Sequence, residues 1–336
     1  MTAVGVVLNR TVTAAITLFG VAAVVFFLLR IVPGDPIAMM IGPAASPSDI
    51  AALRVHYGLD GPLSLQFLIW LKSALVGDFG ISITRHQSVL SILGDHLPAT
   101  IELAFCALAL AILLGGAVAV LGTLAGRRHG SVVIDAVNGV FLALPDFIWA
   151  LIFVLAFGVA IPLFPLTGRI DPSLDIPFRT NFLLIESLVT GRFTVAGNVL
   201  AHMVMPTVAL ALPLAAVIGR VLRQALNEAM VQDYILLARI KGMSEPRLIL
   251  SEALRNAIGP TLALTGVQAT FLIGGTVVVE RIFAYPGIGN LAIEAVINRD
   301  FPLIQGLVLM FGLIFILINI GVDLAVVAVN PKLRHG

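Results

Sequence analysis

The segment DYILLARIKGMSEPRLILSEALRN, residues 233–256, is a charged stretch between two long apolar runs. Seven of its 24 residues are charged, whereas charged residues make up 12% of the 336-residue chain. The flanking runs, residues 202–221 and 259–279, are each long enough to cross a bilayer as a helix. Charged side chains are costly inside hydrocarbon. The pattern therefore indicates two membrane-spanning helices joined by a structured loop in water.

The composition of the whole chain indicates that its main solvent is lipid. Hydrophobic residues make up 59% of the sequence, and the mean hydropathy is +1.05. This leaves too little polar surface to cover a water-soluble globule of this length. The net charge of +1, with no basic block interleaved with aromatic residues, argues against nucleic-acid binding. The single cysteine, Cys106, excludes an intrachain disulfide and a cysteine-based metal cluster, and we expect it to be a packing residue.

The apolar runs predict an all-α polytopic membrane protein with about six spans. The first run, residues 11–29, has 19 residues without a charge and would reach about 28 Å as a helix. A cleaved signal peptide is the alternative, but its apolar core would be shorter, and IVPGDPIAMM offers no clear small-x-small cleavage site. The other runs are residues 99–124, 132–164, 202–221, 259–279 and 303–329.

The run at residues 132–164 is longer than one span requires. Its 33 residues would reach about 50 Å as a single helix. Pro145, in the sequence LPDF, lies inside it and favours a kink. We therefore expect a broken or half-length segment here.

The distribution of Lys and Arg predicts that both termini are cytoplasmic. With that orientation, 11 of the 20 Lys and Arg residues fall on the cytoplasmic side. Four of the other nine lie in or at the edge of the long segment 30–97, which the positive-inside rule weighs little. Segments 30–97 and 165–200 are then extracytoplasmic, and loop 222–258 is cytoplasmic. Apolar residues at helical spacing predict a short helix over 63–74.

Inside the charged stretch, the sequence predicts a helix, a glycine turn and a second short helix. The first helix would end at Gly242, because glycine tolerates a left-handed conformation. Ser244 would cap the second helix, with Pro246 in its first turn, and the next span would begin at Pro260. An ordinary solvated loop is one interpretation. The other is a rigid helix that docks in a groove on a second protein.

Eight short segments, taken together in their order, resemble a known family. They are PGDP at 33–36, YGLDGPL at 57–63, GDFGIS at 77–82, LPATIEL at 97–103, DYILLARIKG at 233–242, ALRNAIGP at 253–260, VERIFAYPGIG at 279–289 and RDFPLIQG at 299–306. The chain resembles, over nearly its whole length, the membrane permease subunits of binding-protein-dependent ABC importers, in the dipeptide/oligopeptide/nickel branch. DYILLARIKG is similar to that branch's cytoplasmic EAA loop.

The resemblance implies a type I ABC importer permease architecture, with residues 1–336 as a single transmembrane domain. Residues 233–256 would be the coupling helix and its approach, which dock on a cytoplasmic ATPase subunit. Ile240 stands where a small alanine is common in the family, which leaves the local packing open. The positions carried over to this loop are Asp233, Ala238, Arg239, Gly242, Ser244, Glu245 and Arg247.

The implied partners are a second related permease, two cytoplasmic ATPases and an extracytoplasmic substrate-binding protein, in a bacterial cytoplasmic (inner) membrane. No cofactor is expected in this chain, and ATP and Mg would be bound by the ATPase subunits. A P-loop requires Gly-Lys-Ser/Thr, yet none of the three lysines follows a glycine. We therefore expect no enzyme activity in this chain. The solute stays open among dipeptides, longer peptides, glutathione-like molecules, nickel complexes, opines and sugars.

Acidic residues in the apolar runs are functional candidates, because a charge at membrane depth is costly. Asp146, beside Pro145, is the candidate for the translocation pathway, where it would attract the amino terminus of a peptide or another cation. The alternative is that Asp146 only caps or pairs within the bent helix. Four other acids are expected near the interfaces, where water reaches them: Glu102, Asp135, Glu280 and Asp323.

Two other classes of protein remain as alternatives. An ion-coupled secondary transporter would show paired intramembrane carboxylates and inverted repeats, and neither is clear in the sequence. A membrane-embedded hydrolase would show turnover by the chain alone, but the sequence contains no His-Glu-x-x-His or Gly-x-Ser-x-Gly motif.

Overall fold

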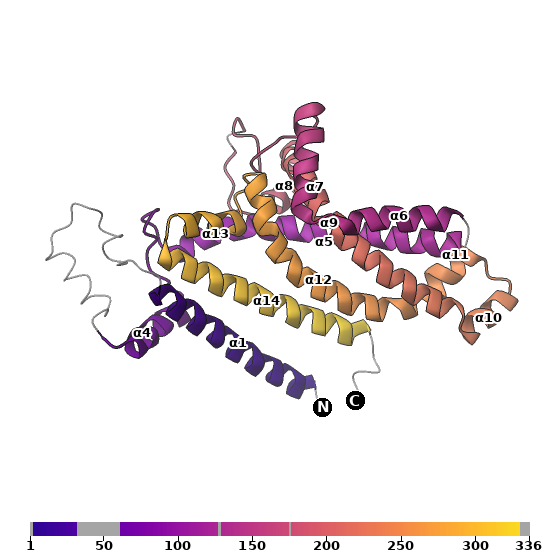
Figure 1. The fold of residues 1–336 in the computed structure, drawn as a ribbon, viewed down its shortest axis with the longest axis horizontal. Coiled ribbons are helices and arrows are strands. Elements are labelled where there is room, and N and C mark those ends of the chain that lie inside the picture. Colours follow the sequence, from indigo (N-terminus) through magenta and orange to yellow (C-terminus); the bar gives the residue numbers. More distant parts are fainter. Residues whose placement is uncertain (1–2, 32–60, 127–128, 175, 330–336) are drawn as a thin grey trace. The chain divides into compact units, whose positions relative to one another are not determined.

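The computed structural model describes residues 3–31, 61–126, 129–174 and 176–329, and most of these residues are helical (Figure 1). Within these ranges the β pairing is limited to an isolated antiparallel bridge between Ile81 and Ser88. Five helices are long and apolar enough to cross a bilayer, and there are six crossings if one bent pair counts as a span. The predicted all-α class and span number are confirmed. The PGDP turn at 33–36 lies outside the described residues.

The helices belong to two compact units. One contains the described parts of 99–289 and 317–336, and the other contains those of 2–98 and 290–316. The chain passes between the units within α5 and α14 and near the start of α13. The elements are α1 (Ala3–Ile31), α4 (Leu63–Leu75), α5 (Val89–Ala125), α6 (His129–Ala143), α7 (Asp146–Phe153), η1 (Val154–Ala160), α8 (Leu183–Val189), α9 (Phe193–Met230), α10 (Asp233–Ile240), α11 (Glu245–Arg247), η2 (Leu248–Ala253), α12 (Leu254–Ile282), α13 (Ile288–Ile297) and α14 (Phe301–Val329).

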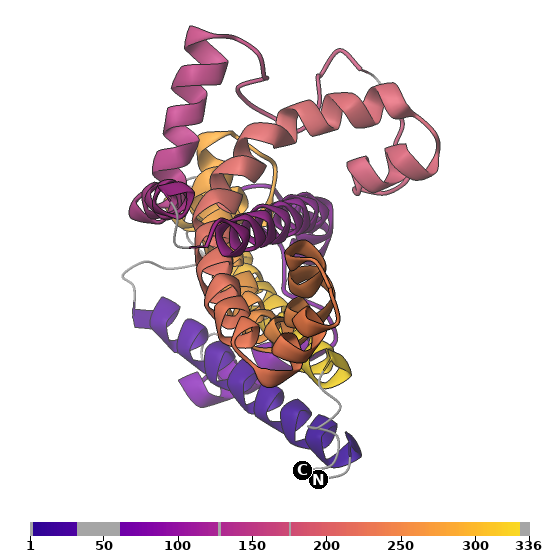
Figure 2. The same ribbon diagram turned by 90° about the vertical axis from the view of Figure 1, so that its right-hand side faces the viewer.

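The predicted break in the third span is confirmed. Helices α6 and α7 meet at 96°, and α7 turns away from α6 in both views (Figure 1, Figure 2). Pro145 is the N-cap of α7 with extended backbone angles, φ −67° and ψ 159°. Proline favours an extended residue before it and cannot donate an N–H to a helix. The chain therefore stops one helix at Ala143 and begins the next at Asp146.

Helix α9 is the centre of the first unit, and small residues let α5 approach it closely. A Cβ on Gly115 would lie 2.7 Å from the carbonyl oxygen of Ala215 and 3.1 Å from the nitrogen of Gly219. Such distances are too short for any side chain, so Gly115 allows close helix packing. A Cβ on Gly116 would meet nothing within 4 Å. Cys106 is half-buried against the same core.

In the second unit, aromatic rings join α1 to α4. The Phe26 ring centroid lies 5.4 Å from those of Phe67 and Trp70, within the usual range for aromatic pairs. The predicted helix over 63–74 is confirmed as α4. In the same unit, the carboxylate of Asp300 accepts hydrogen bonds from the Ser82 hydroxyl at 2.6 Å and the Thr84 hydroxyl at 2.8 Å. This carboxylate therefore ties the segment after α4 to the start of α14.

The expectation that water reaches Glu102 is wrong. Its side chain is 3% exposed, and its Oε2 accepts a hydrogen bond at 2.6 Å from Nη2 of Arg169, which is also buried. The backbone N–H of Ile185, in the first turn of α8, donates to Oε1 at 3.0 Å. A loop 67 residues away along the chain thus covers the carboxylate.

Glu280 is also buried rather than wet, since its side chain is 0% exposed. The Thr100 hydroxyl donates to its Oε1 at 2.7 Å, and the Gly289 N–H donates to its Oε2 at 2.8 Å. A Cβ on Gly287 would lie 2.3 Å from Oε2. The glycines of the PGIG sequence are therefore needed for the chain to fold against this carboxylate.

Two predicted helix boundaries are also wrong. The second span begins at Val89 rather than at 99, and the fifth is continuous with the helix that starts at Glu245 rather than starting at Pro260. Pro98 and Pro260 lie inside their helices. Proline removes one helical hydrogen bond but does not by itself end a helix when the neighbouring turns are well packed.

Arg169→Met is predicted to lower the free energy of unfolding by about 3–5 kcal/mol, because it leaves the Glu102 carboxylate buried without its cation. Thermal unfolding of the detergent-purified protein measures the loss. Arg179→Met, at an exposed side chain of the same loop, should change stability little.

The double variant Arg169→Met/Glu102→Gln should lose less free energy of unfolding than the two single variants lose in sum, because the two side chains interact directly. Additive losses would contradict the proposed pairing.

Candidate functional site

The charged segment forms a compact unit between α9 and α12. Helix α9 ends at Met230, α10 follows at Asp233, and α11 begins at Glu245. Figure 1 shows α10 and α11 beyond the end of α9. Gln232 is the N-cap of α10, and its carbonyl oxygen accepts the N–H of Ile235 at 3.0 Å. The predicted order of helix, turn and second helix is confirmed.

A small hydrophobic cluster holds this unit on the end of α9. Ile235 of α10 and Leu248 of η2 are both 0% exposed. They pack with α9 and with the beginning of α12. Burial of a Leu or Ile side chain contributes about 1.5–3 kcal/mol, so the cluster fixes the unit to both spans. Its buried members are Ala119, Leu222, Leu226, Ala229, Ile235, Leu248, Ile249, Ala253 and Ala257.

The turn after α10 depends on Gly242. The N–H of Gly242 donates to the carbonyl of Arg239 at 3.0 Å, and the N–H of Met243 donates to that of Ala238 at 3.2 Å. These two bonds form a Schellman motif, which requires a left-handed residue after the helix. Gly242 has φ +86°. A Cβ there would meet nothing within 4 Å, so the requirement for glycine comes from the backbone and not from crowding.

An ion pair closes the same turn. The Arg239 guanidinium donates to both carboxylate oxygens of Glu245, from Nε to Oε1 at 2.8 Å and from Nη2 to Oε2 at 3.1 Å. Both side chains are about half exposed. A single surface pair contributes little to stability, but two parallel bonds define an orientation. The pair therefore sets the angle between α10 and α11.

The second helix starts where the sequence predicted. Ser244 is the N-cap residue of α11 with φ −70° and ψ 150°, and Pro246 lies in the first turn. The Ser244 side chain makes no capping hydrogen bond. Ser244 thus has the predicted position, and the turn is instead stabilised by the Schellman bonds and the ion pair.

The outer surface of the unit combines apolar and charged side chains. Ile240 is 75% exposed and Leu237 is 59% exposed. Ile240 stands where a small alanine is common in the family, and its larger side chain is accommodated because it lies at the surface. Asp233, Glu245 and Arg247 are also exposed. An exposed apolar group rimmed by charges is typical of a protein-binding surface.

Asp146 lies at the first turn of α7, next to α12. Its Oδ1 accepts the N–H of Phe147 at 2.8 Å. A Cβ on Gly275 would lie 2.4 Å from its Oδ2, so that glycine makes room for the carboxylate. The side chain is half-buried. Asp146 therefore accepts an N–H in the first turn of α7 through one oxygen, while the other lies against the backbone of α12.

The loop between η1 and α9 is ordered by the half-buried carboxylate of Glu186. Glu186 accepts hydrogen bonds from the N–H of Arg179 at 2.8 Å and from the hydroxyl of Thr180 at 2.7 Å. These donors favour the charged form, so the pKa of Glu186 lies below its ordinary value. The loop therefore presents a defined surface at neutral pH.

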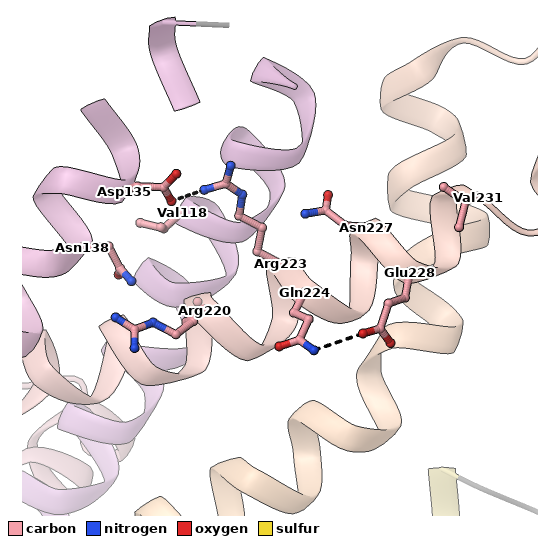
Figure 3. Close-up of a pocket in the computed structure, with 10 residues that line it drawn as sticks. Val118, Asp135, Asn138, Arg220, Arg223, Gln224, Asn227, Glu228 and Val231 are labelled. Carbon is pink, nitrogen blue, oxygen red and sulfur yellow. Dashed lines mark hydrogen bonds and ion pairs between the residues drawn. The ribbon is translucent and has the colours of Figure 1, made fainter. Parts of the chain in front are cut away.

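A pocket of about 540 Å³ lies between α5, α6 and α9 (Figure 3). Arg223 forms an ion pair with Asp135 of α6, and the side chain of Gln224 donates to Glu228 at 3.1 Å. The sequence did not predict this pocket, because its residues come from three separate helices. They are Val118, Asp135, Asn138, Gly219, Arg220, Arg223, Gln224, Asn227, Glu228 and Val231.

The residues predicted for coupling are together in space, and Asp146 belongs to a separate part of the same unit. The sequence missed the pairing of Arg239 with Glu245. A signal was present, since two opposite charges flank a glycine turn at a separation of six residues. Among the residues that the structure describes, no group of three or more His, Cys, Asp or Glu side chains is placed to hold a metal ion.

The comparison with protein families covers almost the whole chain. Residues 111–335 match the family described as "Binding-protein-dependent transport system inner membrane component". Residues 4–104 match the N-terminal region of the same kind of transport-system membrane component.

Individual relatives match from end to end. The di/tripeptide transport system permease protein DppB of Pseudomonas aeruginosa is 35% identical over 323 residues, which is 95% of each chain. The dipeptide transport system permease protein DppB of Escherichia coli is 34% identical, and the match covers 98% of each chain.

Among solved structures, a chain of the inward-facing MetNI methionine ABC transporter superposes with a TM-score of 0.54. The match covers 72% of this chain and 97% of that chain, at 16% sequence identity. This likeness confirms the type I permease fold. With the family match, the predicted resemblance is confirmed, and the chain belongs to the family of binding-protein-dependent transport system inner membrane components, the permease subunits of ABC importers.

Proposed function

We propose that this chain forms one half of a heteromeric pore that imports a dipeptide, oligopeptide or similar small solute by alternating access. The observation that supports the proposal most directly is the α10–α11 unit, a rigid and exposed projection between two spans. The solute class follows the names of the DppB relatives, which are peptide permeases. The second half of the pore would be a related permease.

The unit is built to transmit force. Its hydrophobic cluster includes residues of both α9 and the start of α12. The helix that begins at Glu245 is continuous with the span that ends at Ile282. A push on α10 and α11 would therefore move both spans together, because packed helices shift as bodies and do not deform continuously.

The partner for this projection is a cytoplasmic ATPase. We infer that ATP and Mg bind there, that two such subunits serve the complex, and that loop 222–258 and both termini face the cytoplasm. Helix-in-groove recognition uses apolar side chains on an exposed helix, and Leu237 and Ile240 supply them. The ordered loop at 165–200 would face an extracytoplasmic binding protein.

Asp146 is our candidate for the translocation pathway. Broken spans commonly line transport cavities, where freed backbone groups and side chains contact the solute. Asp146 lies at such a break, and its side chain is partly accessible. A carboxylate there would attract the amino terminus of a peptide. The competing ion-coupled transporter is not favoured by the family match.

The proposed function predicts what is recovered with the chain on purification. Gentle extraction from its native membrane and mass spectrometry should recover a second permease and an ATPase in fixed proportion. A chain recovered alone, or as a homo-oligomer, would contradict the heteromeric assembly. Added ATP and Mg should give vanadate-sensitive hydrolysis in the complex and none in the separated chain.

Gly242→Val is predicted to leave membrane insertion intact and to abolish transport, because a β-branched residue is disfavoured in the left-handed conformation. Gly242→Asn is the matched control, since asparagine tolerates that conformation. Neither side chain meets a clash at Cβ, because nothing lies within 4 Å. Uptake into whole cells checks both variants. Normal uptake by the valine variant would refute the role of the turn in coupling.

Asp146→Asn should keep the hydrogen bond to the Phe147 N–H and remove the charge. Uptake of a dipeptide with a free amino terminus is expected to fall roughly tenfold or more, because hydrogen bonds to charged groups contribute about 1.5–3 kcal/mol. ATP hydrolysis and assembly should be unchanged. An unaltered uptake rate would show that Asp146 serves only as a hydrogen-bond acceptor within α7.

A further inference from the structure

The pocket between α5, α6 and α9 lies at the depth where the apolar spans meet water. The apolar run of α9 ends at residue 221, and Arg220 lines the pocket. On α6, the side chains of Val133 and Val137 are exposed, by 62% and 45%. Exposed valines on a spanning helix contact lipid chains. A lipid lying along α6 would therefore have its headgroup at the level of the pocket.

The pocket lining carries equal positive and negative charge, but not every charged side chain has a hydrogen-bond or ion-pair partner. Arg223 is paired with Asp135, and Glu228 accepts a hydrogen bond from Gln224. Figure 3 shows these two interactions on the pocket wall. Arg220 is exposed, and within the described part of the chain it has no hydrogen bond or salt bridge. Its guanidinium is therefore available for an anion, while Glu228, eight residues further along the same helix, adds negative charge to the lining.

A buried amide gives a second, independent indication. Asn138 lines the pocket, and its side chain is 8% exposed. Its Nδ2 donates to the carbonyl oxygen of Ala216 at 3.1 Å. Its Oδ1 is buried and has no hydrogen-bond partner among the described residues. An unsatisfied buried acceptor is destabilising, so a ligand with an N–H or O–H donor would be favoured there.

We propose that this pocket binds the headgroup of a phospholipid that carries both a phosphate and a primary ammonium. The phosphate lies against Arg220, and the ammonium donates toward Asn138, whose amide bonds α9 at Ala216. Pockets with basic residues between spans commonly bind lipid headgroups. The two arginines and two carboxylates of the lining cancel in charge, which favours a zwitterionic headgroup over an anionic one. A quaternary ammonium has no N–H donor for Asn138, so phosphatidylcholine would bind less well. This inference requires membrane insertion, but not the proposed solute.

The test uses the complete transporter in nanodiscs that contain equal amounts of phosphatidylethanolamine, phosphatidylcholine and phosphatidylglycerol. Native mass spectrometry after partial delipidation measures which lipid is retained. The wild type should retain phosphatidylethanolamine, and Arg220→Gln should reduce that retention roughly tenfold or more, because charged hydrogen bonds contribute about 1.5–3 kcal/mol.

Arg192→Gln is the matched control, because Arg192 is an exposed arginine at the opposite end of the same helix. It should retain as much phosphatidylethanolamine as the wild type, and Arg220→Lys should retain more than Arg220→Gln. Glu228→Gln should shift retention toward phosphatidylglycerol, because it removes a negative charge from the pocket.

Two further additions identify the source of the ligand. Glycerophosphoethanolamine, the free headgroup, should displace the lipid only weakly, since it lacks acyl chains to lie along α6. Equal retention of all three lipids by the wild type would overturn the proposal. Displacement by a dipeptide at a concentration where glycerophosphoethanolamine has no effect would also overturn it, because the pocket would then be a solute site. Neither result would change the recovery of an ATPase, so failure here is separate from failure of the proposed function.

Discussion

Buried carboxylates join the loops of this protein to the ends of its helices. Glu102 and Glu280 in one unit, and Asp300 in the other, each accept hydrogen bonds from residues far away in the sequence. A charge in a dry environment is tolerated only when several donors surround it. Movement of any of these loops would therefore leave a buried charge unsatisfied. The loops must move with the helices to which they are bound.

The α10–α11 unit is held by a different kind of interaction. Its attachment is hydrophobic, through Ile235 and Leu248, and its turn is fixed by backbone hydrogen bonds beside the surface pair of Arg239 and Glu245. Hydrophobic contacts are not directional, so the two spans can tilt while the contact is kept. The glycine turn keeps the angle within the unit. This combination suits the proposed coupling role, in which the unit is pushed repeatedly and must not unfold.

The sequence predicted the features that depend on local chemistry. Apolar length identifies the spans, Pro145 identifies the break, and Gly242 identifies the turn. It failed where distant segments meet. The burial of Glu102 depends on Arg169, which lies 67 residues away. From the sequence alone, an acidic residue near the end of an apolar run is expected to lie in water. Thr100 and Gly289, from two of the short segments that resemble the family, also meet only in the folded chain, where both donate to the carboxylate of Glu280.

Asp146 and Arg220 have neither an opposite charge as partner nor the several neutral donors that surround Asp300. Glu102 and Asp135 each have an opposite charge as partner, whereas Asp146 and Arg220 have no salt bridge within the described residues. Ionisable groups at membrane depth are costly, and those that persist usually contact a ligand or a pathway. One is negative, at a broken span, and the other is positive, where a span meets water. Their opposite signs and separate positions fit the two proposed ligands: a cationic group in transit at Asp146, and a resident lipid phosphate at Arg220.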